Sequence, residues 1–409
     1  MSNRVIVIGA GAAGLLAAGK AAERGREVLL LEKNDRVGKK LLISGKGRCN
    51  ITNNTDIEGL IQNIPGNGNF LYSSFYTFSN ADLIELLHSE GLETKVERGG
   101  RVFPVTDKAW DVVQMLKRYV EKRGAEIQLN MPVNGIETKN GNVTGIRLKD
   151  GSFIESSSVV LATGGASYPG TGSTGDGYKM AHRLGHHITP LKPSLVPLLA
   201  AEDWVAELQG LSLKNVSITI LDKKGKKIYN DFGEMLFTHF GVSGPLILSC
   251  SRHILQYDYK DVKLVIDLKP ALDEETLDAR LQRDFEKFSR KQFKNCLDEI
   301  LPQKMIPVVI KLSQIPEDKP VNQITKTERR AITKLLKAFT LEIAGSRPIS
   351  EAIVTAGGIC TDEINPSTME SKLVKGLFFA GELIDADGYT GGFNLTIAFS
   401  TGYTAGMSC

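Results

Sequence analysis

The feature that most constrains this chain is a glycine-rich turn directly after its first apolar run. Residues 4–8 are R-V-I-V-I, a β-branched run suited to a strand buried on both faces, and residues 9–14, G-A-G-A-A-G, come next. Residues 15–24 then favour a helix that ends at Gly25, and residues 27–31 favour a second strand. The chain therefore begins with the strand, turn, helix and strand that open a parallel α/β sheet.

Each glycine of this turn has a physical task in binding a dinucleotide. Gly9 permits the tight turn, Gly11 lets the backbone approach a pyrophosphate, and Gly14 lets the helix pack closely on the strand. Ala12 and Ala13 lie in the first turn of the helix, whose N-terminus stabilises phosphate charge. The turn therefore predicts a pyrophosphate site, provided that its sequence context agrees.

The context agrees, because the second strand ends in Glu32, where a carboxylate accepts hydrogen bonds from a ribose diol. A turn that was merely rich in glycine would leave Glu32 without a role. Residues 33–53 contain no second crossover helix and form a loop rich in Gly, Lys and Asn. Such a loop suits a long ligand lying extended over the sheet edge, so the sequence favours FAD over NAD as the bound dinucleotide.

A second match to the same pattern, at residues 170–175, fails the test of context. It follows Pro169 rather than a strand, and no acidic residue stands about 20 positions later. We interpret it as a loop whose backbone amides face flavin or substrate, followed by a helix over residues 176–184.

The rest of the N-terminal half alternates helices with short strands. Residues 80–91 and 107–124 have helical periodicity, the second with Asp107 as N-cap and Gly124 as its stop. The turn pairs Asn-Gly and Asp-Gly indicate an antiparallel meander before the parallel sheet resumes. The strands that we expect are residues 94–97, 127–129, 133–139, 143–148 and 159–162.

The chain returns to its first domain near its C-terminus. Residues 159–165 and 376–382 each predict a strand ending in small residues, where an open α/β sheet binds ligands, and a closing helix begins after residue 391. We therefore predict an α/β fold with three parts: an FAD-binding domain of residues 1–193 and 347–409, an inserted β-rich domain of residues 194–272 and about 320–346, and an inserted helical domain of residues 273–319.

Charge gives only local information about partners. The chain has 50 basic and 47 acidic residues, which does not by itself imply a nucleic-acid or membrane partner, and no apolar run is long enough to span a membrane. Residues 280–337, however, contain 14 Lys and Arg against 7 Asp and Glu. This is either a solvated helical face or a surface for RNA; Arg330, Lys334 and Lys337 share one side of a helix there.

Five scattered cysteines without a C-x-x-C pair predict a reduced, cytoplasmic protein with no metal site and no redox disulfide. Cys49 lies between Arg48 and Asn50, where cations would lower the pKa of a thiol; the alternative is a small packing residue. Arg48 and Arg101 are candidates to grip a phosphate or carboxylate, with a surface ion pair as the alternative.

Several motifs together carry a resemblance to a known family: G-A-G-A-A-G at 9–14, S-G-K-G-R-C-N-I-T-N at 44–53, G-G-R-V-F-P at 99–104, A-T-G-G-A-S-Y-P at 162–169, T-G-S-T-G-D-G-Y at 171–178, T-H-F-G-V-S-G-P at 238–245, V-T-A-G-G-I at 354–359 and F-A-G-E-L-I-D-A-D-G-Y-T-G-G-F-N-L at 379–395. Over essentially its whole length the chain resembles the BaiN-like family of bacterial FAD-dependent oxidoreductases. The resemblance implies an FAD domain of glutathione-reductase type, interrupted by a β-barrel-like piece and a small helical domain.

The resemblance also implies an activity. NADH or NADPH would reduce the flavin, and hydride would then pass to an activated carbon–carbon double bond. The substrate would be an unsaturated small molecule, such as a bile-acid derivative, or a uridine of large-subunit ribosomal RNA. The basic segment at residues 280–337 makes RNA the leading specific hypothesis. A flavin-bound binding protein without turnover is the alternative from another class.

Residue roles follow from the resemblance in the same way. The residues implied in FAD binding are Gly9, Gly11, Ala12, Ala13, Gly14, Glu32, Lys33, Lys40, Gly45, Arg48, Val133, Thr163, Gly164, Gly381, Glu382, Gly391, Gly392, Phe393, Asn394 and Leu395. Among them the Val133 backbone would meet adenine, and the helix begun by residues 391–395 would stabilise the anionic edge of reduced flavin. The candidate proton donors are Cys49, Tyr168, His239 and Tyr389.

Overall fold

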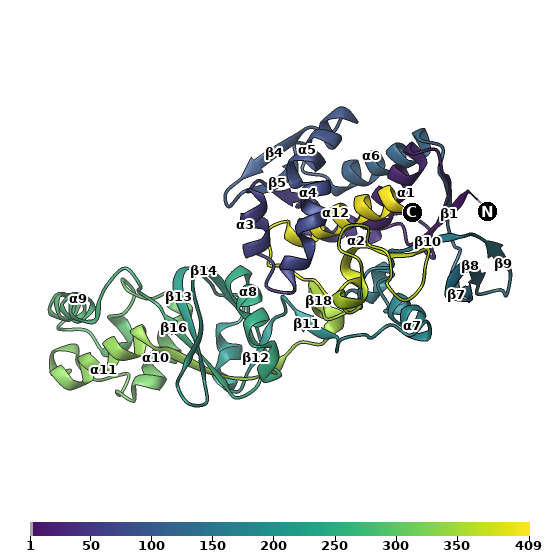
Figure 1. The fold of residues 1–409 in the computed structure, drawn as a ribbon. Coiled ribbons are helices and arrows are strands. Elements are labelled where there is room, and N and C mark those ends of the chain that lie inside the picture. The colour runs from purple at the N-terminus through teal and green to yellow at the C-terminus, as the bar shows by residue number, and fades with distance from the viewer. Residues whose placement is uncertain (1–2) are drawn as a thin grey trace. The chain divides into compact units, whose positions relative to one another are not determined.

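The computed structural model describes residues 3–409, which fold into two compact units (Figure 1). The chain leaves the first unit after Ser194 and re-enters it at Pro348. We call this first part the sheet unit, and we call Leu195–Arg347 the insertion unit. The α/β class and the inserted barrel that the sequence predicts are confirmed.

The sheet unit is built on a five-stranded parallel sheet. Its strands, in spatial order, are β19 (Leu377–Phe379), β10 (Ser158–Leu161), β1 (Arg4–Ile8), β2 (Glu27–Leu31) and β6 (Glu126–Gln128). In the central strand β1, Ile8 is paired with Leu31 on one side and Leu161 on the other. The predicted opening unit of strand, turn, helix and strand is confirmed.

One strand prediction is wrong in its partner. The predicted antiparallel meander includes residues 127–129, but this strand, β6, pairs in parallel with β2. A strand of three residues carries no signal of direction. The chain reaches this sheet edge through helix α6 (Ala109–Lys122), which makes a crossover connection between parallel strands.

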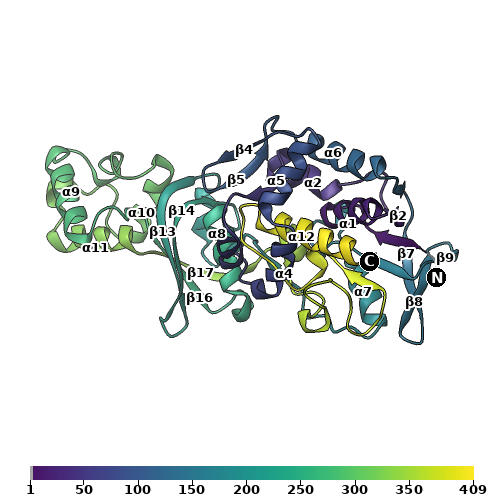
Figure 2. The same ribbon diagram turned by 45° about the horizontal axis from the view of Figure 1, so that its top comes forward.

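Helices pack against this sheet and against one another, and α1 and α12 are apolar and buried over most of their length. Helix α12 (Phe393–Ser408) packs beside α1 (Ala12–Glu23), so that the last helix of the chain lies against the first, and α6 also packs on α1 (Figure 2). The other helices of this unit are α2 (Lys39–Ile43), α3 (Ile57–Gln62), α4 (Tyr72–Thr77), α5 (Asn80–Ser89) and α7 (Asp176–Arg183).

The predicted cap of α6 is wrong. Lys108 is its N-cap, and Asp107 lies outside the helix with φ +57°. The Asp107 carboxylate binds the side chains of Arg48 and Lys95 instead. Sequence spacing could not reveal these partners, because they come from a distant loop and strand.

Three small antiparallel sheets complete the sheet unit: β3 (Thr52–Asn53), β5 (Arg101–Pro104) and β4 (Thr94–Glu97); β7 (Val133–Lys139), β8 (Asn142–Leu148) and β9 (Phe153–Glu155); and β11 (Lys192–Ser194) with β18 (Val354–Ala356). Only the second of them is the predicted meander. The first brings the S-G-K-G-R-C-N-I-T-N and G-G-R-V-F-P motifs together, since β3 pairs with β5.

The insertion unit contains a closed antiparallel barrel of β12 (Leu198–Ala200), β15 (Gly241–Ser243), β14 (Lys227–Phe237), β13 (Ser212–Asp222), β16 (Val262–Asp267) and β17 (Phe339–Ser346). Its helices are α8 (Pro245–His253), α9 (Glu274–Lys287), α10 (Ile306–Ser313) and α11 (Lys326–Lys337), of which α11 packs on α9 and α10. Helix α11 therefore occupies much of the range 320–346 that we predict as β-rich. The finer division of the insertion into two domains stays a prediction.

The basic face predicted on α11 is smaller than the spacing implies. Arg330 and Lys334 are exposed, but the Lys337 ammonium lies 2.6 Å from the Asp267 carboxylate and donates to the carbonyl oxygen of Leu272 at 2.5 Å. Lys337 thus fixes the end of α11 to the barrel. Among residues 3–409, no helix combines the length and apolarity that a membrane crossing requires.

Candidate functional site

A cavity of about 560 Å³ lies at the carboxyl ends of the parallel strands in the sheet unit. Residues at or next to these ends, Ile8, Leu31, Ala162 and Ala380, all line it. Open α/β sheets bind ligands at this edge, and the volume is within the usual range for a ligand pocket. The site predicted from the glycine-rich turn therefore has a cavity beside it.

Most residues implied in FAD binding line this cavity: Gly9, Gly11, Ala12, Ala13, Glu32, Lys33, Lys40, Gly45, Val133, Thr163, Gly164, Gly381, Glu382, Asn394 and Leu395. Gly14, Gly391, Gly392 and Phe393 lie in the same turns without lining it. Arg48 is also outside, for a different reason described below. Their binding of FAD stays a prediction.

The first turn of α1 is shaped to receive an anion. Its N-cap, Gly11, provides no side-chain hydrogen bond, and the turn contains no acidic residue, so its amide groups remain available. A Cβ atom on Gly11 would meet no protein atom within 4 Å, whereas one on Gly14 would lie 1.8 Å from the carbonyl oxygen of Gly9. Gly11 thus leaves space on the ligand side, and Gly14 permits the close turn.

Helix α12 presents a second N-terminus to the cavity. Its N-cap, Gly392, has φ +104° and provides no side-chain hydrogen bond. Asn394 closes the preceding loop, because its amide group donates to the Gly388 carbonyl at 2.7 Å and accepts from the Gly388 N–H at 2.9 Å. The helix dipole therefore favours negative charge in the cavity near Asn394 and Leu395.

Glu32 is held in place with one acceptor position to spare. Its carboxylate accepts hydrogen bonds from the Ala10 N–H at 2.8 Å, the Asn34 N–H at 2.9 Å and the Asn34 side-chain amide at 2.7 Å. A carboxylate offers about four lone-pair sites. One position remains for a ligand hydroxyl, which fits the ribose diol of a dinucleotide.

Lys40 and Glu382 form an ion pair that fixes the loop before Tyr168. The Glu382 carboxylate lies 2.6 Å from the Lys40 ammonium and accepts from the Ser167 hydroxyl and the Thr355 N–H, both at 2.9 Å. Burial alone would raise the pKa of Glu382, but Lys40 and these hydrogen bonds outweigh it and hold the pKa below its usual value. Glu382 is therefore an ionised anchor.

Tyr168 is the candidate proton donor that the structure places at the cavity. It lines the cavity, is 38% exposed, and adopts φ +51°, which is uncommon for a bulky residue. Its N–H donates to the carbonyl of Ser350 at 3.3 Å, and Ser167 beside it is fully buried. The fold holds this conformation through its neighbours, as strained residues at functional sites require.

The predicted activation of Cys49 is wrong. Cys49 is fully buried, does not line the cavity, and burial raises the pKa of its thiol to about 11. The guanidinium of Arg48 does not act on it, because it binds the carboxylates of Glu97 and Asp107. Arg48, expected to bind cofactor, thus forms an ion-pair cluster outside the cavity.

The two other candidate donors lie elsewhere. His239 belongs to the insertion unit, in the turn between β14 and β15, where its ring packs edge-on against Phe240 with centroids 4.9 Å apart. Tyr389 precedes α12, and its N–H donates to the Asn63 carbonyl at 3.0 Å. Neither residue lines the cavity, and their catalytic roles stay predictions.

Sequence reasoning missed several cavity residues, among them Asn34, Lys39, Lys46, Met131 and Ile353. Asn34 had a signal, since it follows Glu32 by two positions at a strand end. Ile353 stands beside the V-T-A-G-G-I motif, which brings β18 to the site. Among residues 3–409, no group of His, Cys, Asp and Glu is arranged to hold a metal ion.

The parallel sheet, the uncapped α1 and the acidic end of β2 define a Rossmann-type dinucleotide-binding protein, and the long loop with a second helix N-terminus fits FAD. Comparison with family models agrees. The chain belongs to the family described as the HI0933-like protein Rossmann domain, whose model matches residues 3–408. This is an FAD-dependent oxidoreductase family, and the predicted resemblance is confirmed.

Two kinds of curated relatives match almost end to end. A 3-dehydro-bile acid delta(4,6)-reductase of Clostridium scindens is 31% identical over 99% of this chain and 98% of its own length. Ribosomal RNA dihydrouridine synthases of Haemophilus influenzae and Escherichia coli are each 32% identical, over 98% and 97% of this chain and 97% and 96% of their own lengths.

Solved structures share the fold at lower identity. An open flavocytochrome c3 fumarate reductase has a TM-score of 0.52 at 17% identity, covering 99% of this chain and 77% of its own. A 3-ketosteroid delta1-dehydrogenase of Sterolibacterium denitrificans has a TM-score of 0.51 at 15% identity, covering 99% of both chains. These likenesses concern the fold alone.

Proposed function

We propose that this protein is an FAD-dependent reductase that uses NADH or NADPH to saturate an activated carbon–carbon double bond, with a uridine of large-subunit ribosomal RNA as its substrate. The observation that carries the proposal is the end-to-end similarity to two kinds of relatives, a bile-acid reductase and ribosomal RNA dihydrouridine synthases, whose names each imply such a reduction. The chemistry that FAD supplies when bound is hydride acceptance and donation. A protein acid must deliver the accompanying proton.

The chain's residues divide the task of holding FAD. The first-turn amides of α1 would bind the pyrophosphate, and the spare acceptor position of Glu32 would bind ribose. Val133 lines the cavity at the start of β7, where its backbone would meet adenine. The N-terminus of α12 would stabilise negative charge on the reduced ring.

Tyr168 is the residue that we propose as proton donor. The bonds of Ser167 to Lys40 and Glu382 fix the backbone immediately before it, and its side chain is at the cavity. The phenol O–H would protonate the substrate carbon next to the one that receives hydride, and solvent would restore the proton. Lys40 and Glu382 act as positioning residues in this scheme.

RNA is preferred over a small molecule because two of the full-length relatives are named for it and because Arg330 and Lys334 are exposed on α11. Reduction of a small-molecule enone, the activity in the name of the third relative, is the second candidate. The two candidates share the cavity and the donor chemistry and differ only in the substrate that enters.

Two measurements test the proposal in sequence. Purified protein should be yellow, and its absorbance should bleach anaerobically with NADH or NADPH; folded protein that binds no flavin would overturn it. Mass mapping of large-subunit RNA from the parent and a deletion strain should then show a dihydrouridine lost in the deletion strain. Unchanged RNA beside turnover of an enone would support the second candidate, and no acceptor turnover at all would indicate a binding protein.

A further inference from the structure

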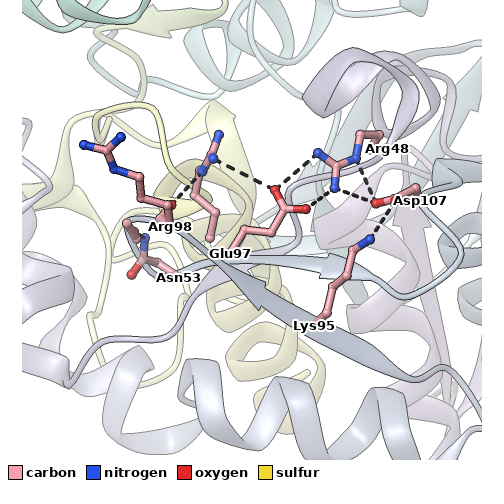
Figure 3. Close-up of polar contacts among 8 residues, drawn as sticks. Arg48, Asn53, Lys95, Glu97, Arg98 and Asp107 are labelled. Atoms are coloured by element: carbon pink, nitrogen blue, oxygen red, sulfur yellow. Dashed lines mark hydrogen bonds and ion pairs between the residues drawn. The ribbon is translucent and has the colours of Figure 1, made fainter. Parts of the chain in front are cut away.

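A group of charged side chains surrounds the turn between β4 and β5 of the sheet unit (Figure 3). We call it the β4–β5 charge cluster. It contains the two carboxylates of Glu97 and Asp107 and four cations, Arg48, Lys95, Arg98 and Arg101. The cations exceed the carboxylates by two, and the proposed reaction at the cavity does not use any of these residues.

The inner half of the cluster neutralises itself. Arg48 bridges both carboxylates, and the Lys95 ammonium lies 2.6 Å from Asp107. Hydrogen bonds from Lys95 and Arg48 hold the pKa of Asp107 below its usual value, and those from Arg48 do the same for Glu97. Both carboxylates therefore stay ionised, and their charges are matched by Arg48 and Lys95.

Arg98 and Arg101 carry the surplus charge. Both are exposed, and within residues 3–409 the Arg98 guanidinium makes no hydrogen bond or ion pair; Figure 3 shows it extending away from Glu97. Arg101 donates from Nε to the Arg98 carbonyl at 3.0 Å, and its nearest carboxylate oxygen, on Glu97, is 3.9 Å away. Most of the guanidinium donors of this pair face solvent.

Asn53 ties this turn to the loop that precedes helix α12. Its side-chain amide donates to the Gly99 carbonyl in the turn and to the Gly391 carbonyl, both at 3.0 Å. Gly391 immediately precedes the N-cap of α12, and Asn394 in the first turn of α12 lines the cavity. The exposed arginines are therefore coupled to the helix N-terminus that faces the ligand.

Phe103 makes a second connection to the cavity. It follows Arg101 in β5, and the guanidinium carbon of Arg48 lies 4.1 Å from the centre of its buried ring. A Cβ atom on Gly45, which lines the cavity, would lie 3.4 Å from the same ring. Two sets of contacts, through Asn53 and through Phe103, therefore connect the segment that carries Arg98 and Arg101 to residues at or next to the cavity lining.

We propose that Arg98 and Arg101 bind a phosphodiester group of the RNA strand whose uridine enters the cavity. Guanidinium groups bind phosphate oxygens through paired hydrogen bonds, and surplus positive charge attracts a polyanion. A nucleotide whose base enters the cavity keeps its phosphates outside, and two exposed arginines on a segment joined to the cavity lining are suited to bind one of them. The inference rests on the proposed function and adds to it a specific phosphate contact.

The test uses the double variant Arg98→Gln with Arg101→Gln and, as its probe, large-subunit RNA transcribed in vitro. Dissociation constants are measured over a series of salt concentrations. We expect binding at physiological salt to weaken about tenfold. The slope of the logarithm of the binding constant against the logarithm of the salt concentration should become shallower by about 0.7 for each lost contact to single-stranded RNA. The matched control is Arg118→Gln, an exposed arginine on α6 away from the cluster, which should leave both quantities unchanged.

Two further variants separate binding from folding. Arg98→Gln alone removes a side chain without internal partners, so this variant should keep the parent's melting temperature. Its salt slope should change by about half as much as that of the double variant. Arg101→Lys keeps the positive charge but loses the paired hydrogen bonds that a guanidinium donates to phosphate. This variant should therefore retain the salt slope while binding RNA more weakly. An unchanged slope in the double variant, with parental melting temperature and flavin absorbance, would overturn the inference.

Failure of the inference differs from failure of the proposed function. If the deletion strain loses a dihydrouridine but the double variant binds RNA like the parent, the function stands and the arginines have no contact with phosphate. If the RNA of the deletion strain is unchanged, the proposed substrate is wrong. A double variant that instead raises the KM of a carboxylated enone would assign the pair to a small-molecule carboxylate and overturn the phosphate assignment.

Discussion

The ammonium of Lys40 lies 2.6 Å from the carboxylate of Glu382, which joins two residues 342 positions apart in the chain. The pair connects helix α2 to the segment that follows β19, and through Ser167 it also holds the loop after β10. Three segments at the cavity therefore share one ion pair. Loss of either charge should affect all three.

Replacing Lys40 with Met should leave a partly enclosed carboxylate without its cation. We expect a loss of about 1–3 kcal/mol in the free energy of unfolding, since both side chains keep some contact with solvent. A double-mutant cycle with Glu382→Gln, followed by urea unfolding, should give a favourable coupling energy. Additive effects of the two substitutions would contradict the pairing.

The same pair predicts an acid dependence of stability. Because the folded pKa of Glu382 is below its usual value of 4.5, its contribution is complete above that pH and is lost as the pH falls through the folded pKa. In Lys40→Met the carboxylate keeps its burial and loses its main partner. Without Lys40, burial raises the folded pKa of Glu382, so protonation relieves an unpaired carboxylate. The loss of stability on acidification that Glu382 causes in the parent should therefore shrink or reverse in Lys40→Met, which unfolding midpoints between pH 6 and pH 3 would show.

Gly11 and Gly14 form a matched pair of test positions in one turn. Gly11→Ala should fold with a free energy of unfolding within about 1 kcal/mol of the parent, because its Cβ meets no protein atom and its φ is −82°. The added methyl group would occupy space on the ligand side, so we expect FAD affinity to fall about tenfold or more. Flavin titration with thermal melting of the flavin-free protein measures both.

Gly14→Ala should destabilise the fold itself rather than weaken ligand binding. Its Cβ would lie 1.8 Å from the Gly9 carbonyl oxygen, and backbone cannot move aside as a flexible side chain can. We expect at least about 3 kcal/mol of destabilisation before any ligand is added. A stable Gly14→Ala protein, or a Gly11→Ala protein that binds FAD like the parent, would contradict the assigned roles.

The parts of the site that the sequence could predict are local in the chain. The turn at Gly9–Gly14 and the acid at Glu32 belong to one short unit, and their order alone defines the contacts that they make. The Lys40–Glu382 pair could not be inferred, because it depends on how three segments that are distant in the sequence return to one sheet edge. Burial of Cys49 is likewise a tertiary property, and it reversed the pKa shift expected from its cationic neighbours.

Asp107 is a second residue whose role could not be predicted from local sequence. Its spacing before an apolar periodic segment is typical of a helix cap, yet Arg48 and Lys95 bind its carboxylate and Lys108 is the N-cap. Local capping contributes about 1 kcal/mol, which two ion pairs can outweigh. Such competition is decided by residues brought from other strands, so spacing in the sequence does not reveal it.

Cys49 and Tyr168 give opposite predictions for proton delivery. Tyr168→Phe should keep flavin binding but lower the rate of substrate reduction by about 10²-fold or more, as expected for loss of a general acid. Cys49→Ser should stay within about threefold of the parent, because the thiol lies outside the cavity with a pKa of about 11. Stopped-flow oxidation of reduced enzyme by substrate separates the two. A large effect in Cys49→Ser alone would reverse the assignment.

His186 is a buried group whose titration should destabilise the sheet unit in mild acid. Its Nδ1 lies 3.0 Å from the Glu363 carboxylate and its Nε2 lies 3.0 Å from the Ser371 hydroxyl oxygen, which already accepts from the N–H groups of Leu373 and Val374. The Ser371 hydroxyl must therefore donate to Nε2, which requires a neutral ring. Burial lowers the pKa of His186, and Glu363 offsets only part of that effect.

The sign of the pH dependence follows from this lowered pKa. Below about pH 6.5 His186 is protonated in the unfolded chain but stays neutral in the folded protein. The free energy of unfolding therefore decreases as the pH is lowered, until the folded pKa is reached, by at most about 1.4 kcal/mol for each pH unit. His186→Gln should be less stable at pH 7.5 but show a smaller decrease from pH 7.5 to 5.5 in urea unfolding. His182→Gln, at an exposed histidine of the adjacent helix, should keep the full decrease. Equal decreases in both variants would mean that other groups cause the acid sensitivity.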